Sequence, residues 1–286
     1  MSQRRILLAA ALAASCGVVL IAVARSLPTA SGGAASPAPA KPVAGERKAA
    51  SGFLAFTRTP RRPGNLLARR DVIGQSAERR PIGLLQRGDP AIEGELLVFG
   101  CIHGDECAAR DLQPLAPGSG CPDPASEIFI VPNLNPDGHA SDTRLNGRGV
   151  DLNRNFPSGW RPIGRRGDPQ YSGPRPFSEP ETRLAARIVR KLRPEATIWF
   201  HQHHAPRPLV RAWGQSAPDG RAFARLARMP FRRLPWPEGT APNWQNHRFP
   251  GTSSFVIELP PGALGEPLRG RIERAVVRFA RKVGED

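Results

Sequence analysis

The stretch Glu95 to Glu106, ELLVFGCIHGDE, joins a run of apolar residues directly to a polar cluster. The apolar part, from Glu95 to Ile102, is typical of a buried strand, and a turn into a helix after it would bring His103 and Glu106 onto one face. Imidazole and carboxylate both bind zinc well, and a catalytic zinc site has three protein ligands and an open fourth position. Because an H-x-x-E pair often arises by chance, the prediction of a metal site depends on a third ligand elsewhere in the chain.

A second apolar run, Ala196 to His201, also ends in a histidine and supplies a candidate third ligand. His201 comes first after the hydrophobic residues, at the end of the predicted strand. His203 lies two residues further on and would share that face only if the strand continued. The sequence therefore favours His201 over His203 and predicts one zinc ion bound by His103, Glu106 and His201.

Short apolar runs alternate with helical patterns along the rest of the chain. Patterns typical of buried strands cover 81–86, 95–102, 127–132, 196–201, 209–213 and 254–259. Apolar residues at helical spacing predict helices over 179–192, 219–228 and 266–283. Strands separated by helices favour an α/β sheet, and the polar clusters fall at strand ends, where ligands bind in such sheets.

The first fifty residues differ in composition from the rest. Two arginines precede a long apolar run that ends in an A-x-A cleavage site at Ala24, so residues 1–24 are predicted to be a signal peptide. The alternative is an uncleaved signal anchor, because the run is just long enough to span a bilayer. Residues 25–50 are rich in Pro and Ala without apolar periodicity, which predicts a flexible linker. The folded domain is therefore expected over 51–286, outside the cytoplasm.

The charge balance of the chain is strongly basic. It has 41 Lys and Arg against 25 Asp and Glu, a formal net charge of +16. Such an excess favours weak association with an anionic cell envelope. The basic residues are scattered over the whole length without an aromatic-interleaved basic motif, so we expect no specific nucleic-acid binding.

Four cysteines are present, of which Cys16 lies in the predicted export segment. Cys107 and Cys121 flank a short loop rich in Pro and Gly. In an oxidising compartment these two are the predicted disulfide pair, and Cys101, within an apolar run, is predicted to remain a buried thiol.

A longer series of motifs resembles a known family. In chain order the series contains HGDE at 103–106, NPDG at 135–138, RLNGRGVDLNRNFP at 144–157, YSGP at 171–174, FHQ at 200–202 and IELP at 257–260. This order resembles that of the zinc metallocarboxypeptidases, over about Leu96 to Pro261. The resemblance implies a single α/β domain with a mostly parallel, mixed central sheet flanked by helices on both faces.

The resemblance also implies roles for individual residues. Glu258 matches the general base, and a carboxylate on a buried strand is costly unless it has a function. Arg144 matches the arginine that stabilises the oxyanion, and Arg148 competes with it but fits the family spacing less well. The pair Asn153–Arg154 matches the residues that bind a substrate's terminal carboxylate, for which the planar guanidinium is suited. Asp151 is interpreted as structural.

One family feature has no counterpart in this chain. Many members use a tyrosine from a loop between the third ligand and the base, but the single tyrosine here, Tyr171, precedes His201. Candidates for the role in that interval are Trp236, Trp244 and His247. No pattern assigns the role to any of them.

The resemblance implies zinc-dependent hydrolysis of an amide bond next to a terminal carboxylate. The strings GVDLNRNFP and IELPPG look most like those of bacterial murein peptide amidases, which cut the γ-D-glutamyl–diaminopimelate bond of peptidoglycan stem peptides. The expected substrates are muropeptides or the C-terminal residues of ordinary peptides, and we expect a monomer. The alternatives are a digestive-type carboxypeptidase, a catalytically inactive envelope-binding protein with the same fold, and a polyanion-binding protein whose binding is salt-sensitive.

Overall fold

The computed structural model describes residues 67–89, 95–112, 126–202 and 206–283. All the described residues belong to one compact unit, Arg47–Asp286. The predicted export segment, the linker, Cys121 and His203 lie outside the described residues. Within the described ranges, every helix is too short or too polar to cross a membrane.

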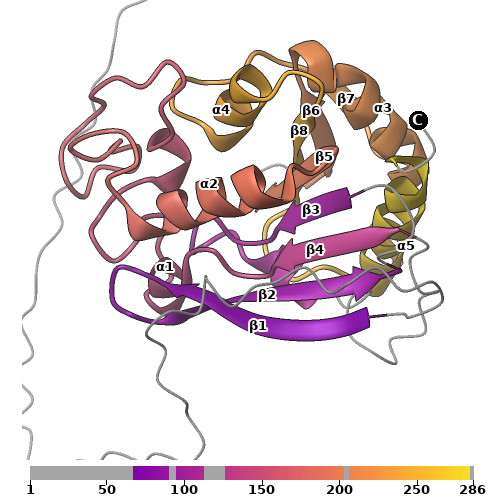
Figure 1. The fold of residues 1–286 in the computed structure, drawn as a ribbon, viewed down its shortest axis with the longest axis horizontal. Helices are drawn as coiled ribbons and strands as arrows, with labels where there is room; N and C mark the ends of the chain where they lie inside the picture. The colour runs from indigo at the N-terminus through magenta and orange to yellow at the C-terminus, as the bar shows by residue number, and fades with distance from the viewer. Residues whose placement is uncertain (1–66, 90–94, 113–125, 203–205, 284–286) are drawn as a thin grey trace, which may run out of the picture. The chain divides into compact units, whose positions relative to one another are not determined.

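Eight strands form one mixed sheet in the order β1-β2-β4-β3-β5-β8-β6-β7 (Figure 1). The strands are β1 (Leu67–Gln75), β2 (Pro81–Gly88), β3 (Glu95–Phe99), β4 (Glu127–Val131), β5 (Ala196–Gln202), β6 (Leu209–Ala212), β7 (Phe231–Arg233) and β8 (Ser253–Leu259). The four central strands β4, β3, β5 and β8 run parallel to one another, as β6 does to β7. The pairs β1–β2, β2–β4 and β6–β8 are antiparallel. The expected mostly parallel, mixed sheet is thereby confirmed.

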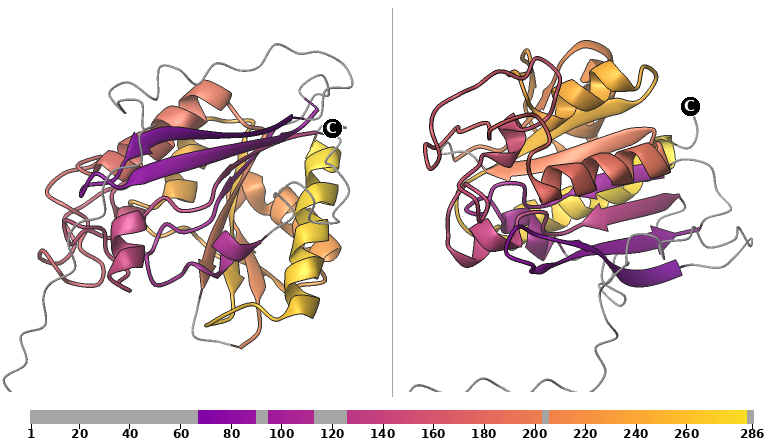
Figure 2. Two further views of the ribbon diagram at one scale, coloured as in Figure 1. Left: turned by 90° about the horizontal axis from the view of Figure 1, so that it is seen from below. Right: turned by 60° about the vertical axis from the view of Figure 1, so that its left-hand side comes forward.

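Helices cover both faces of the sheet (Figure 2). The α-helices are α1 (Pro136–Ala140), α2 (Pro180–Leu192), α3 (Ala217–Ala227), α4 (Ala241–Arg248) and α5 (Glu266–Val283). Short 3-10 helices are η1 (Ala108–Asp111), η2 (Leu152–Arg154) and η3 (Gly214–Ser216). The buried residues of α3 and α5 share one apolar core, and those of α2 and α4 share the other.

Alternate residues of the central strands face these two cores. In β3, Leu96 and Val98 belong to the core under α3 and α5, whereas Leu97 and Phe99 belong to the core under α2 and α4. Side chains alternate between the faces of a sheet, so a strand buried on both sides is apolar throughout. This is why the central strands could be recognised as continuous apolar runs.

Two strands and two helices were not predicted. The edge strand β1 carries charged side chains in its middle and is held by its pairing with β2. The three-residue strand β7 lies at the other edge, and α1 and α4 have polar sequences without apolar periodicity. The strand expected over 95–102 ends at Phe99. Gly100 still donates to the carbonyl of Val131 in β4, and the carbonyl of Cys101 accepts from the loop that follows β4.

A buried carboxylate lies in the first turn of α2. Glu181 is fully buried and accepts hydrogen bonds from the backbone N–H of Ala77 (2.8 Å) and from Nδ2 of Asn146 (3.2 Å). Burial raises the pKa of Glu181 to about 7, an effect that these hydrogen bonds oppose and the nearby Glu179 reinforces.

This raised pKa predicts a pH-dependent stability. Between the ordinary pKa of 4.5 and the folded-state value of about 7, the folded chain keeps a proton on Glu181 that the unfolded chain has released. The contribution of Glu181 is therefore fully present below about pH 4.5 and lost as the pH rises to about 7, amounting to roughly 3 kcal/mol at most. We expect Glu181→Gln to flatten this decline in urea unfolding between pH 4.5 and 8. Parallel curves for the two proteins would contradict the assignment.

Candidate metal centre and active site

Three neighbouring parallel strands bring the predicted site residues together at their carboxyl ends. His103 and Glu106 follow β3, and His201 is the penultimate residue of β5. Glu258, the penultimate residue of β8, is in register with His201. Chain segments that are far apart in sequence therefore meet at one edge of the sheet.

The three predicted ligands converge on one point. Nδ1 of His103 lies 3.0 Å from one oxygen of Glu106, and Nδ1 of His201 lies 2.8 Å from the other. The two Nδ1 atoms are 3.2 Å apart, and both imidazoles are buried. Such a convergence of two ring nitrogens and a carboxylate forms a group that could hold a metal ion. Two histidines and a glutamate are a known ligand set of catalytic zinc, so the residues present fit this ion.

The electrostatics of the group suit a cation. Burial alone would raise the pKa of the Glu106 carboxyl, but the imidazoles of His103 and His201 outweigh burial and hold it well below its usual range. Burial alone would lower the pKa of His103, but the carboxylates of Asp151 and Glu106 raise it. Glu106 is therefore an anion in the folded protein, as a zinc ligand must be.

The loop that carries His103 and Glu106 packs tightly against the segment of the NPDG motif. A Cβ atom on Gly104 would lie 2.0 Å from the carbonyl carbon of Gly138, so only glycine fits there. Asn135 caps α1 by accepting from the N–H of Gly138 (3.0 Å), and its Nδ2 donates to the carbonyl of Ile102 (3.2 Å). The HGDE and NPDG motifs are thus two halves of one packed unit.

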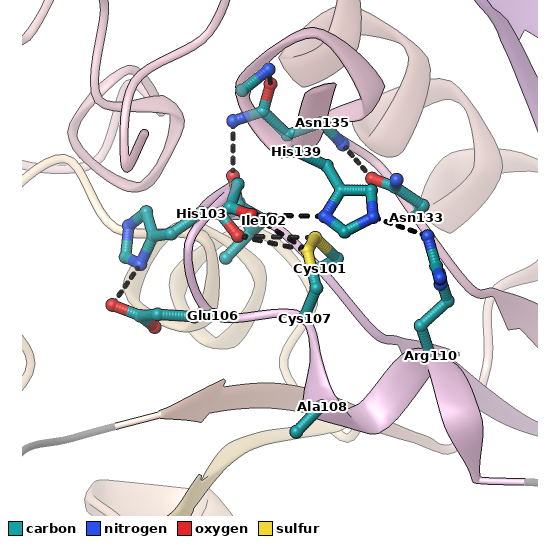
Figure 3. Close-up of a disulfide and its surroundings, with 12 residues drawn as sticks. Cys101, Ile102, His103, Glu106, Cys107, Ala108, Arg110, Asn133, Asn135 and His139 are labelled. Atoms are coloured by element: carbon teal, nitrogen blue, oxygen red, sulfur yellow. Dashed lines mark hydrogen bonds and ion pairs between the residues drawn. A yellow bond between two sulfur atoms is a disulfide. The ribbon is translucent and has the colours of Figure 1, made fainter. Parts of the chain in front are cut away.

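The disulfide of this region differs from the predicted pair. Cys107 is bonded to Cys101, with 4.8 Å between their Cα atoms, and this disulfide lies beside the imidazole of His139 (Figure 3). The prediction of a Cys107–Cys121 disulfide and a free thiol at Cys101 was therefore wrong. The physical reason is the turn after β3, which returns the chain to the end of that strand and places Cys107 beside Cys101.

Asp151 orients the first ligand. Its Oδ1 accepts from Nε2 of His103 (3.0 Å), which leaves Nδ1 of that ring facing the centre. Its Oδ2 accepts from Nε and Nη2 of Arg144 (3.0 and 2.9 Å). Against the effect of its complete burial, His103 and Arg144 hold the pKa of Asp151 well below its usual range. The sequence analysis missed this role, because His103 lies 48 residues before Asp151 in the chain.

Removal of the Asp151 charge is expected to weaken zinc binding without removing a ligand. Carboxylates that orient a metal-binding histidine affect metal affinity by about 10- to 100-fold, so we expect a loss of that size in Asp151→Asn. Calorimetric titration of the apoprotein with zinc measures the effect. Asp142→Asn, at an exposed position, is the matched control and should titrate like the parent. Unchanged affinity in Asp151→Asn would show that His103 is held by other contacts.

All seven predicted site residues line one pocket of about 260 Å³. They are His103, Glu106, Arg144, Asn153, Arg154, His201 and Glu258. Arg148 lies apart from this pocket, with its nearest acidic partner, Glu179, 3.9 Å away. Of the two arginines that competed for the oxyanion role, Arg144 is the one beside the ligands.

The arginines and the asparagine of the pocket differ in how many partners they have. Arg144 donates from Nη1 to Glu106 (2.9 Å) and from Nη2 to Asp151 (2.9 Å). Asn153 accepts from the N–H of Ala241 (2.9 Å), and its Nδ2 lies 3.3 Å from Nε2 of His201. Arg154 donates to the carbonyl of Asn153 (2.8 Å). Asn153 is thus largely occupied by protein contacts, whereas Arg154 has only neutral partners among the described residues.

Among the other residues that line the pocket, Gln202 and Arg211 were not predicted as site residues, and Trp236 was one of three candidates without an assigned role. Gln202 accepts from the N–H of Ala108 and donates to the carbonyls that follow β8, which ties the ends of β5 and β8 together. Arg211 on β6 donates from Nη1 to Oε1 of Glu258 (3.2 Å). Trp236 also lines the pocket, whereas Trp244 is buried in a core and His247 binds the carbonyl of Asn243 in its own helix.

A mixed α/β sheet that gathers two histidines, a glutamate and a further carboxylate at its carboxyl end is a metallohydrolase arrangement. The family model described as zinc carboxypeptidase matches residues 125–246, which include Arg144, Asn153, Arg154 and His201. Residues 125–246 are therefore similar to the zinc carboxypeptidase family. His103, Glu106 and Glu258 lie outside the matched stretch, and their placement comes from the structure.

Similar proteins include amidases and carboxypeptidases. Murein peptide amidase A of Escherichia coli is 31% identical over 124 residues, which are 37% of this chain and 48% of that protein. The chain therefore matches about half the length of this relative. The solved murein-tripeptide amidase of Escherichia coli O157 has 21% identity and a TM-score of 0.56, covering 80% of this chain and 97% of the other. Carboxypeptidase A of Helicoverpa armigera has 18% identity and a TM-score of 0.62, covering 77% and 69%. These two likenesses show the fold.

Proposed function

We propose that this protein hydrolyses an amide bond next to a terminal carboxylate in a zinc-dependent reaction, with peptidoglycan stem peptides as its preferred substrates. The observation that carries the proposal is the convergence of His103, Glu106 and His201 in one pocket with Glu258 and Arg154. A metal ligand set, a further carboxylate and a guanidinium in one cavity supply an electrophile, a base and an anchor for an anionic substrate end.

The three ligands, Glu258 and two arginines of the pocket each have a role in this reaction. A zinc ion held by the three ligands would polarise the scissile carbonyl and activate water. Glu258 takes the proton from the attacking water and returns it to the leaving amine. Arg144 stabilises the negative charge that develops on the carbonyl oxygen, and Arg154 binds the terminal carboxylate of the substrate.

Two observations support stem peptides over ordinary peptides. The curated relatives include murein peptide amidase A, and the GVDLNRNFP and IELPPG strings resemble those of that group. The resemblance to carboxypeptidases, which include the catalytic chain of human carboxypeptidase N at 27% identity over 207 residues, supports ordinary C-terminal residues as the second candidate.

A substrate panel tests the proposal. The zinc-loaded protein is incubated with muropeptides and with peptides of varied C-terminal residue, and the products are separated by mass. Release of diaminopimelate supports the proposed substrate, whereas release of ordinary C-terminal residues alone favours the second candidate. The proposal is wrong if zinc-loaded protein releases nothing from either set.

The apolar N-terminal segment and the net charge of +16 support a location outside the cytoplasm and weak, salt-sensitive association of a monomer with an anionic envelope. Cell fractionation in low and high salt tests this placement. Retention in the envelope fraction that does not depend on salt would count against electrostatic association with the envelope.

A further inference from the structure

We propose that Arg211, together with the indole N–H of Trp236, binds a second anionic group of the substrate, so that the pocket selects a leaving residue whose side chain ends in a carboxylate. Glutamate, aspartate and diaminopimelate have this chemistry. The inference rests on the proposed function, because it names the class of residue that the hydrolysis releases.

The strand register places Arg211 on the pocket side of the sheet. Arg211 of β6 pairs directly with Val256 of the antiparallel strand β8. Directly opposite residues in an antiparallel pair project to the same face, and so does Glu258, two residues beyond Val256. All three side chains line the same pocket. Arg211 therefore reaches the substrate side of the catalytic carboxylate.

Two donors of the pocket are buried without a partner within the described part of the chain. They are Nε of Arg211 and the indole Nε1 of Trp236. A buried N–H that makes no hydrogen bond costs free energy, and the few such groups in a folded protein call for an explanation. A substrate carboxylate would satisfy these donors, because it accepts several hydrogen bonds at once.

The charges of the pocket also leave room for a second anion. Arg144 has two carboxylate partners, Glu106 and Asp151, whereas Arg211 has Glu258 as its only carboxylate partner among the described residues. Arg154 forms no ion pair with a carboxylate among the described residues, and burial together with the charges of Arg144 and Arg211 lowers its pKa against the opposing effect of Asp151. The terminal carboxylate of the substrate would pair with Arg154 and leave Arg211 without a substrate partner. A side-chain carboxylate on the same substrate residue would pair with Arg211 and relieve the repulsion between the two guanidiniums.

The test compares two peptides that differ only in the last residue, glutamate or its neutral isostere glutamine. The zinc-loaded full chain is expected to prefer glutamate in kcat/KM by about tenfold or more, the scale of one charge-assisted hydrogen bond. Arg211→Gln should bring this preference close to one. Arg211→Lys, which keeps the charge but loses the fork, should retain part of it, and Trp236→Phe should reduce it by a smaller factor. The control Arg232→Gln, at an exposed position on β7, should keep the full preference.

A purely positioning role for Arg211 predicts a different result. If Arg211 only holds Glu258 in place, Arg211→Gln lowers kcat equally for both peptides and shifts the pH profile. The preference for glutamate over glutamine then stays unchanged, and that outcome overturns the proposal.

A binding measurement separates this inference from the proposed hydrolysis. Calorimetric titration of the zinc-loaded parent with free glutamate and free glutamine should show tighter binding of glutamate, lost in Arg211→Gln. This result supports the anion site even if no peptide is cleaved. Equal binding of both ligands by the parent overturns the site, whether or not the protein is a hydrolase.

Discussion

The Glu258→Gln variant is expected to cleave its substrates about 10²- to 10⁴-fold more slowly than the parent, the usual effect of removing a general base. Glutamine has the same shape as glutamate and can still accept a hydrogen bond from Arg211, but it cannot take a proton from water. Because Glu258 is not among the three converging ligands, zinc affinity should stay close to that of the parent. Steady-state kinetics and zinc titration on the same preparation measure the two effects.

The matched control for this variant is Glu266→Gln, which makes the same change at an exposed position at the start of α5. It should leave kcat unchanged. Full activity of Glu258→Gln would exclude Glu258 as the base, and a parallel loss of zinc would mean that Glu258 contributes to the metal site instead.

The His201→Ala variant is expected to lose zinc binding and activity together. Removal of one of three ligands leaves two donors on one loop, too few for a catalytic zinc site. Zinc at a thousandfold excess over its dissociation constant stabilises the folded parent by about 4 kcal/mol, so added zinc should raise the Tm of the parent but not that of the variant. A chelator should abolish the activity of the parent, and added zinc should restore it.

His247→Ala serves as the control for this variant, since His247 is exposed and bonded within its own helix. It should retain both the Tm increase and the activity. A zinc-dependent Tm increase that survives in His201→Ala would place the metal elsewhere in the protein.

The sequence allowed the central strands and the metal ligands to be predicted because both depend on local patterns. The buried strands β3, β4, β5 and β8 contain continuous apolar runs, and His103 and His201 are the first histidines after the apolar runs of β3 and β5. Elements without such a pattern were missed, among them α1, whose helical turn depends on the Asn135 cap and its packing against Gly104.

The contacts that complete the site could not be predicted, since they join residues that only the fold brings together. Asp151 acquires its role through His103, 48 residues away in the chain. Arg211 acquires its role through the antiparallel pairing of β6 with β8, which places it beside Glu258. The predicted disulfide was wrong for the same reason, because the spacing of cysteines in the sequence does not reveal which of them a turn brings together.

The position of the ligands in the chain links metal binding to the order in which the protein folds. His103 and Glu106 are three residues apart, whereas His201 is 98 residues from His103 and reaches it only when β3 and β5 are paired. A partly folded chain therefore offers zinc a weak, two-donor site, and the third donor arrives with the central sheet. Binding then favours the docked strands over every arrangement that separates them. Zinc uptake during refolding would thus mark the moment at which the central strands come together.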